Sequence, residues 1–233
     1  MKREIRLSII IPTLNEAKNL PLLLSDLSEI REKSEILIID SNSKDATKDI
    51  SKIYGAKFFN TNIKNRGLQL NTGAKESKGD WLLFIHADSR LNQNWSKEVN
   101  LVLSKKNKFI YFFKFKVNNN NLIFRFLELL VNFRTFFLRT PYGDQGLLIH
   151  RDTYFKYGGY KNLPLMEDID LINRIKDKEL LFSLKTSINT SGRKWQKNNI
   201  FYQSIINFTL RRKWSRGCDL NKIYEEYYSR KNS

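Results

Sequence analysis

Short apolar runs alternate with longer amphipathic stretches through the first hundred residues. Residues 7–11 form an apolar run ended by Pro12, and the stretch over 16–30 then repeats leucine every three or four residues, as one face of a helix does. Further runs of strand length occupy 35–39, 57–60 and 81–85, with helical patterns between them. This order is typical of α/β proteins, so it predicts a mainly parallel central sheet flanked by helices.

The pattern changes beyond residue 104. Aromatic residues dominate a strand-like run over 109–117, and an amphipathic helix is predicted over 122–138. A short strand over 146–150, a helix over 168–178 and an apolar-faced helix over 200–214 follow, before a basic, tyrosine-rich end. Because no long linker interrupts the chain, we expect one domain over 1–233 with a helical extension at its carboxyl end.

Positive charge is concentrated in two segments. The chain has 41 Lys and Arg against 24 Asp and Glu, and residues 105–151 and 185–233 hold most of the excess. Nucleic acid, an anionic membrane surface and phosphorylated small molecules are the partners that such a balance attracts. A nucleic-acid-binding protein that uses the basic, aromatic C-terminal third is therefore one hypothesis, although it leaves the acidic residues at the strand ends unexplained.

The sequence also restricts the compartment. Cys218 is the one cysteine, which excludes an intramolecular disulfide framework and fits a reducing compartment. No secretory signal is visible, and charged residues interrupt the most apolar region, 109–138, so we expect no membrane span there. We expect a cytoplasmic protein. The 122–138 helix either packs on the sheet as core or rests on the inner face of an anionic membrane.

Polar groups follow the predicted strands at one edge of the sheet. Asn15 and Glu16 follow the first strand, and Asp40 ends the second. Open α/β sheets bind ligands at the carboxyl ends of their strands, where a carboxylate and an amide can accept from a pyrimidine base and from ribose. In the alternative interpretation, Asp40 caps the next helix and Asn15 turns the chain.

Two further clusters suit phosphate and metal. Arg66 stands near a predicted helix N-terminus, where anions bind. His86-Ala87-Asp88 follows an apolar strand, so the Asp88 carboxylate could hold a divalent cation against a diphosphate. His86 is either a second ligand or a structural hydrogen-bond partner.

The third group is acidic and the fourth is basic. Glu167, Asp168 and Asp170 stand at the mouth of a predicted helix; capping explains one of them, and Glu167 or Asp168 could act as a general base. Arg193, Lys194 and Trp195 combine two cations with an indole, which fits a diphosphate and a sugar or base face. A solvated basic loop is the alternative for this last segment.

In this order, the clusters resemble the family 2 glycosyltransferases, whose fold is a single nucleotide-binding α/β domain called GT-A. The resemblance covers roughly residues 5 to 195. It is strongest to a bacterial subfamily with His-Ala-Asp at the metal position and a Tyr-Gly-Asp-Gln-Gly segment, here 142–146. The matching segments are 9–16, 38–45, Arg66-Gly67, Asn71 with Gly73-Ala74, 86–88 and Glu167-Asp168.

The resemblance implies inverting transfer of a sugar from a nucleotide diphosphate donor to an acceptor hydroxyl. Asp168 would be the general base with Glu167 beside it, and Asp88, with His86 less securely, would bind Mg²⁺ or Mn²⁺. The donor would be bound by Pro12, Thr13, Asn15, Glu16, Asp40, Arg66, Asn71, Ala87, Asp88, Arg193, Lys194 and Trp195.

The family pattern also shapes what we expect of partners. His86 breaks the usual Asp-x-Asp metal motif, and the processive Gln-x-x-Arg-Trp signature is absent, so we expect transfer of a single sugar. We divide the domain into a nucleotide-sugar-binding half (1–104), an acceptor half (105–190) and a basic helical tail (191–233). The expected partners are the donor, an acceptor that is unidentified and could be lipid-linked, and an anionic membrane surface, but not nucleic acid.

Overall fold

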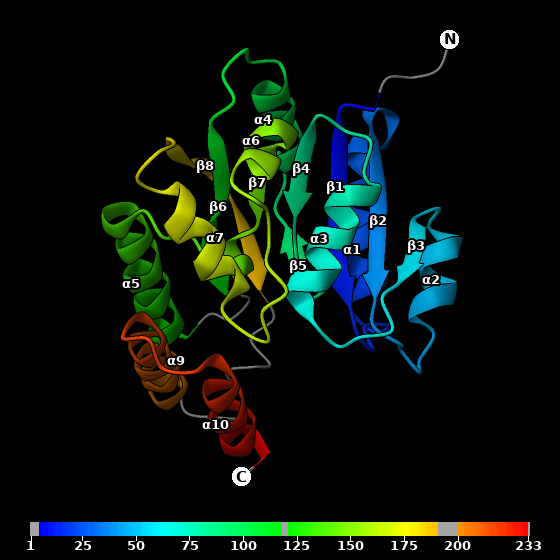
Figure 1. Ribbon diagram of the computed structural model, residues 1–233. Helices are drawn as coiled ribbons and strands as arrows, with labels where there is room; N and C mark the ends of the chain where they lie inside the picture. Colours follow the sequence, from blue (N-terminus) through cyan, green and yellow to red (C-terminus); the bar gives the residue numbers. More distant parts are fainter. Residues whose placement is uncertain (1–4, 118–120, 191–199, 233) are drawn as a thin grey trace.

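The computed structural model describes residues 5–117, 121–190 and 200–232, and these residues form an eight-stranded sheet with helices on both faces (Figure 1). The strand order is β3-β2-β1-β4-β7-β6-β8-β5. The strands are β1 (Leu7–Thr13), β2 (Ser34–Asp40), β3 (Lys57–Asn60), β4 (Trp81–Phe84), β5 (Ser89–Leu91), β6 (Ile110–Val117), β7 (Leu147–His150) and β8 (Leu181–Thr190). The α-helices are α1 (Leu20–Asp26), α2 (Thr47–Ile53), α3 (Arg66–Glu76), α4 (Trp95–Leu103), α5 (Leu122–Leu138), α6 (Arg151–Lys156), α7 (Glu167–Ile175), α9 (Ile200–Ser215) and α10 (Leu220–Asn232), with 3₁₀ turns η1 (Leu27–Lys33) and η2 (Gly143–Gln145).

The alternation of side chains along the strands divides the core into two layers. Ile9 and Ile11 of β1 point to one face, where they pack with α1 and α4, whereas Ile10 points to the other, where it packs with α3 and α7. Both faces of the sheet are therefore covered, which explains why β1 and β2 are almost continuously apolar. The predicted α/β class with flanking helices is confirmed.

The direction of β7 determines which loops meet. β1 pairs in parallel with β2 and β4, but β7 is antiparallel to β4, with Phe84 opposite Leu147. The beginning of β7 therefore lies beside the end of β4. As a result, the loop that precedes β7 reaches the same edge of the sheet as the loops that follow β1, β2 and β4. We call this edge the rim.

The structure adds elements that the sequence pattern does not predict and corrects several boundaries: the helix predicted over 168–178, for example, is α7 over Glu167–Ile175. β5, β8, α4 and α6 are all additions, and β8 pairs in parallel with β6 although it mixes polar and apolar residues. Pro12 was expected to end the first strand, but β1 continues to Thr13. Proline is tolerated because the pairing of β1 with β4 stops at Ile10, so no hydrogen bond on that side requires an N–H from Pro12.

The C-terminal helices form a small cluster of their own. Ile206 and Leu210 of α9 pack against Ile223 of α10, and Leu165 and Met166, just before α7, join them. This cluster fixes the C-terminal helices next to the start of α7 (Figure 1). Within the described ranges, no helix combines the length and the apolar character needed to cross a bilayer.

Gly73 should tolerate no side chain, because α3 lies close against the sheet there. A Cβ at this position would collide with the Ile10 side chain and lie 3.0 Å from Ile39 Cγ1. We expect Gly73→Ala to lower the free energy of unfolding by about 1–3 kcal/mol in urea titrations, even though alanine favours helices. Thr72→Ala, on the same helix, is the control and should change stability by less than about 0.5 kcal/mol. Equal behaviour of the two variants would contradict this close packing.

Candidate active site

The loops after β1 and β2 are joined by a hydrogen-bond network at the rim. The Asp40 carboxylate is 2% exposed; it accepts from Thr13 Oγ1 at 2.8 Å and from the Ser43 amide at 2.7 Å. Asn15, at a positive φ of 55°, donates its amide to Ser43 Oγ and accepts from the Lys44 amide. Thr13, Asn15 and Asp40, the residues predicted to bind the nucleoside, thus belong to one hydrogen-bond network that joins the two loops.

The structure rejects one alternative for Asp40. This residue does not cap α2, because the helix begins at Thr47, and Asp45 accepts the Thr47 amide at 3.0 Å. Asp45 and Thr47 also contact the first loop: Asp45 accepts from the Ala17 amide, and Thr47 Oγ1 accepts from the Glu16 amide. Asp40 instead closes the turn through Ser43, and binding of a nucleoside by Asp40 stays a prediction.

Glu167 is a buried carboxylate held by Arg66. It is 1% exposed and accepts a hydrogen bond from Arg66 Nε, although the two residues are 101 positions apart. Burial raises the pKa of Glu167, and the neighbouring Asp168 adds to this rise, while the Arg66 guanidinium opposes it. Burial works against the charge of Arg66, but Glu167 and Asp168 outweigh it and raise the Arg66 pKa. Gly67 permits the close approach of α3 to this region, because a Cβ there would collide with the carbonyl of Lys161 and lie 3.2 Å from Glu167 Cβ.

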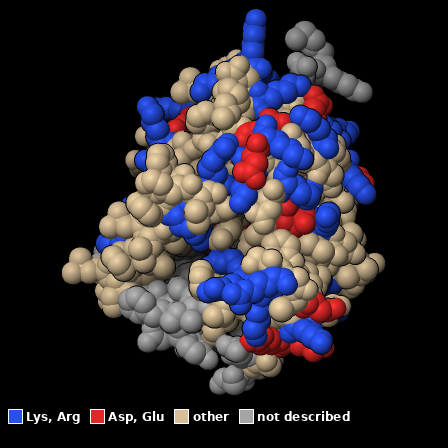
Figure 2. All heavy atoms as spheres, turned by 60° about the vertical axis from the view of Figure 1, so that its left-hand side comes forward, with Lys and Arg blue, Asp and Glu red and all other residues tan. Residues whose placement is uncertain are grey.

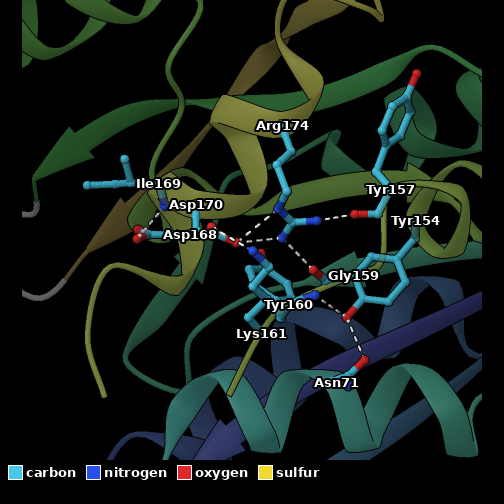
Figure 3. Close-up of polar contacts among 10 residues, drawn as sticks. All are labelled: Asn71, Tyr154, Tyr157, Gly159, Tyr160, Lys161, Asp168, Ile169, Asp170 and Arg174. Carbon is cyan, nitrogen blue, oxygen red and sulfur yellow. Dashed lines mark hydrogen bonds and ion pairs between the residues drawn. The ribbon is translucent and has the colours of Figure 1, made fainter. Parts of the chain in front are cut away.

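A small pocket opens beside this ion pair. Asp168 Oδ2 accepts from the Gly143 amide at 2.8 Å. Its Oδ1 accepts from the Ile169 amide at 2.9 Å (Figure 3). A Cβ on Gly143 would lie 3.0 Å from His86 Nε2 and 3.3 Å from Asp168 Oδ2, so both side chains face one point. His86, Gly143, Glu167 and Asp168 line the pocket with Tyr160.

The described residues contain no dedicated metal cage. No group of three or more His, Cys, Asp or Glu side chains among them is arranged to hold a metal ion. Mg²⁺ is commonly held by only one or two carboxylates together with substrate phosphates. Asp88 is half-buried in the short loop between β4 and β5, two residues after His86. A carboxylate and an imidazole are donors that can share a metal with a diphosphate, and metal binding by Asp88 and His86 stays a prediction.

Two arginines enclose the loop that carries Gly143. The guanidinium carbon of Arg134 on α5 lies 3.8 Å from the Tyr142 ring centroid, and that of Arg211 on α9 lies 4.9 Å from it. Burial lowers the pKa of Arg134; nearby Arg211 acts in the same direction, whereas Tyr142, Asp144 and Asp168 oppose it. The sequence reasoning missed both arginines, because nothing in their local pattern relates them to Tyr142.

The sequence profile of Glycosyl transferase family 2 matches residues 8–161. The chain belongs to this family. The 4,4'-diaponeurosporenoate glycosyltransferase of Staphylococcus haemolyticus is 36% identical over 102 residues, which are 40% of this chain and 26% of that protein. Glycosyltransferase AglE of Haloferax volcanii is 32% identical over 97 residues, 38% of this chain and 32% of that protein. The matches thus span about a quarter to a third of these relatives.

Solved structures agree on the GT-A fold. S. aureus TarS 1–349 in complex with UDP-GlcNAc superimposes with a TM-score of 0.64 at 17% identity, covering 80% of this chain and 58% of that one. Glucosyl-3-phosphoglycerate synthase from Mycobacterium tuberculosis, with Mn²⁺ and UDP, gives 0.55 at 16% identity over 80% and 70%. The matched residues include the loops of the rim, the His86 motif and the Tyr142 loop. The match ends before Glu167 and Asp168.

The remaining predicted residues have varied positions. Asn71 Oδ1 accepts from the Tyr154 hydroxyl at 3.2 Å, so this amide supports the fold beneath the pocket. Ala87 is 3% exposed and packs in the core, which leaves only its backbone for a ligand. Pro12 lies half-buried within β1, and the Glu16 carboxylate accepts from Asn19 at 2.6 Å. Arg193, Lys194 and Trp195 lie outside the described residues.

Arg174 holds the segment that precedes the acidic cluster in place. Arg174 of α7 pairs with Asp170 at 2.7 Å and donates to the carbonyls of Tyr157 and Gly159 (Figure 3). Gly159 has no room for a side chain, since it has a φ of 59° and a Cβ would lie 2.6 Å from the Tyr154 ring. Asp170 is therefore a positioning group, which explains the third carboxylate of the cluster.

Removal of Arg66 should destabilise the protein in a pH-dependent way. In Arg66→Met, the largest influence that lowers the pKa of Glu167 is gone, so the pKa rises further and the folded state binds that proton more tightly than the unfolded chain does. Stability then falls as the pH rises above the ordinary value of 4.5 toward the raised pKa. We expect a loss of about 1–3 kcal/mol at pH 7, moderated because the Arg66 side chain is 42% exposed, and a smaller loss at pH 4.5.

The double variant Arg66→Met/Glu167→Gln is the control for this prediction. Without a carboxylate at 167, the pH dependence should disappear and most of the lost stability should return. Urea midpoints at the two pH values measure both effects. A loss in Arg66→Met that is the same at both pH values would contradict the role of the ion pair.

Proposed function

We propose that this protein is an inverting glycosyltransferase that moves one sugar from a nucleotide diphosphate sugar to an acceptor hydroxyl. The observation that carries the proposal is the convergence of Asp168 and His86 on Gly143, at the mouth of a pocket at the rim. The nucleotide would bind to the turn around Asp40, which leaves the sugar to extend toward the pocket. Family membership supports this activity and gives no support to the nucleic-acid-binding alternative.

Asp168 is the proposed general base. Its two oxygens accept from the amides of Gly143 and Ile169, which fix the carboxylate at the start of α7. The base removes the proton of the acceptor hydroxyl as the acceptor oxygen bonds to the anomeric carbon from one side. On the opposite side, the bond to the diphosphate breaks, and the leaving group departs with the electron pair. This in-line geometry inverts the anomeric carbon.

The leaving group requires positive charge. Asp88 and His86 would hold Mg²⁺ or Mn²⁺ together with diphosphate oxygens, and the metal would neutralise the charge that develops there. Arg193 and Lys194 are proposed to assist, with Trp195 stacking on the donor. Structural neighbours solved with Mn²⁺ and GDP-Man, and with Mg²⁺ and UDP, support a metal and a nucleotide donor. Glu167 is proposed to contact the sugar or acceptor beside the base.

The acceptor is proposed to approach from the half of the molecule that carries α5 and the Tyr142 loop. Arg134 and Arg211 place two cations around Tyr142, next to the pocket. This arrangement suits an acceptor with a phosphate group, which is the chemistry of a lipid-linked acceptor at an anionic membrane.

Replacing Asp168 should abolish chemistry and leave donor binding intact. We expect Asp168→Asn to slow the release of nucleotide diphosphate from the sugar nucleotide that best stabilises the protein, with water as acceptor, by about a hundredfold to ten-thousandfold. The melting temperature shift with the corresponding diphosphate should stay unchanged. Asp177→Asn, an exposed site just after α7, is the matched control. Equal rates in the two variants would rule out Asp168 as the base.

Replacing Asp88 should remove the metal dependence of nucleotide binding. Thermal-shift assays with UDP, GDP and dTDP, each with and without Mn²⁺, should reveal one diphosphate that stabilises the wild type in a metal-dependent way. Asp88→Ala should lose that dependence. Asp80→Ala, at the opposite end of β4, should keep it. If single-stranded DNA or RNA stabilises the protein in a salt-sensitive manner and no nucleotide does, the proposal is wrong.

A further inference from the structure

Helix α5 is apolar on both of its sides, and only one side is packed. Phe124 and Leu127 pack against Phe115 and Val117 of β6. The opposite side exposes large side chains at spacings of three and four residues, so they share one face along the whole helix. Its main members are Leu122 (82% exposed), Phe126 (55%), Leu129 (68%), Phe133 (63%), Phe136 (76%) and Phe137 (62%), which we call the outer face.

An exposed surface of this kind is unusual. More than half of the exposed large apolar side chains in the described part of the chain belong to α5. Single exposed apolar residues are normal on soluble proteins, but a contiguous patch marks an interaction site. The sequence left open whether this helix is core or rests on a membrane; the structure shows that its inner side is core and its outer face is exposed to solvent within the described residues.

The charges of α5 are those of a helix that meets an anionic surface. Arg125 and Arg134 lie on its flanks, where Arg125 also pairs with Glu128 and Arg134 lies against Tyr142. Arg139 follows the end of the helix and donates to the Glu179 carbonyl. The single acidic residue, Glu128, is 9% exposed and turned inward, where it accepts from the Val117 amide at 2.7 Å. Figure 2 brings this side of the molecule forward and shows a broad uncharged area with basic side chains near it.

We propose that the outer face of α5 docks into the interface of a membrane that contains anionic lipids. Apolar side chains on one face with arginines at the sides are the composition of interfacial helices, whose binding grows with buried apolar area and with attraction to anionic lipid. Charge selects this occupant over a second copy of the chain: the formal net charge is +17, so two copies repel each other whereas anionic lipid attracts each. At 17 residues, about 26 Å, α5 would lie along the surface.

Docking would bring the candidate active site to the membrane. Arg134 extends from α5 to the Tyr142 ring at 3.8 Å, and the next residue, Gly143, donates to Asp168. Gly143 lines the pocket, and its neighbour Tyr142 contacts Arg134 of α5, so the pocket and the docking helix are directly linked. A lipid-linked acceptor would meet the proposed base without leaving the bilayer, a consequence that rests on the proposed function, whereas docking itself does not.

The experiment is vesicle flotation of the full chain without nucleotide, so its result is independent of catalysis. Vesicles of phosphatidylcholine alone are compared with vesicles of phosphatidylcholine and phosphatidylglycerol at a 7:3 ratio, at about 0.1 M salt, where charges within about 10 Å still interact. We expect the wild type to float with the anionic vesicles at least tenfold more than with the neutral ones. Leu129→Glu should reduce that binding at least tenfold.

Leu101→Glu is the matched control, because Leu101 is 63% exposed on α4 and Leu129 is 68% exposed on α5. It should float like the wild type, and equal melting temperatures should show that both variants fold. Absent flotation of the wild type, or equal losses in the two variants, would overturn the proposal. So would a stable dimer in light scattering that Leu129→Glu dissociates, because a second copy would then cover the outer face.

Discussion

The ion pair between Arg66 and Glu167 joins two helices from distant parts of the chain. Arg66 begins α3, which packs on the parallel strands, and Glu167 begins α7, which follows the antiparallel part of the sheet. An almost fully buried carboxylate is costly unless it is paired, so the starts of these two helices must stay in contact. Asp168 is the next residue along α7. Its position relative to the rim is therefore fixed by the need of the buried Glu167 carboxylate to stay paired with Arg66.

The reversed strand β7 has a comparable geometric role. A sheet made only of parallel strands would receive loops at the rim from βα connections alone. Because β7 is antiparallel to β4, the segment that precedes it, with Tyr142 and Gly143, reaches the same edge. The backbone amide of Gly143 then contacts Asp168, and its missing side chain leaves room for His86. The site combines polar groups from both kinds of connection.

Local pattern predicted the first half of the fold well, for a physical reason. Strands covered on both faces are continuous apolar runs, and their ends locate Asp40 and the His86 motif at one edge without any knowledge of long-range contacts. The sequence did not predict β8, because its mixture of polar and apolar residues lacks the apolar pattern of a strand. Other features depend on contacts between distant segments, and a local sequence pattern cannot predict these. They are the pairing of Arg66 with Glu167, the hydrogen bonds of Arg174 and the arginines next to Tyr142.

The enclosure of Tyr142 by two guanidinium groups makes the pocket loop a point of thermodynamic linkage. Arg134 belongs to α5, which carries the outer face, and Arg211 belongs to α9 of the C-terminal cluster. Both guanidinium groups lie over the Tyr142 ring. An anionic headgroup bound to either arginine would compete with that ring and would alter the freedom of the loop beside Asp168. Linkage is reciprocal, so whatever factor an anion imposes on ligand affinity in the pocket, a ligand in the pocket imposes on the affinity for that anion.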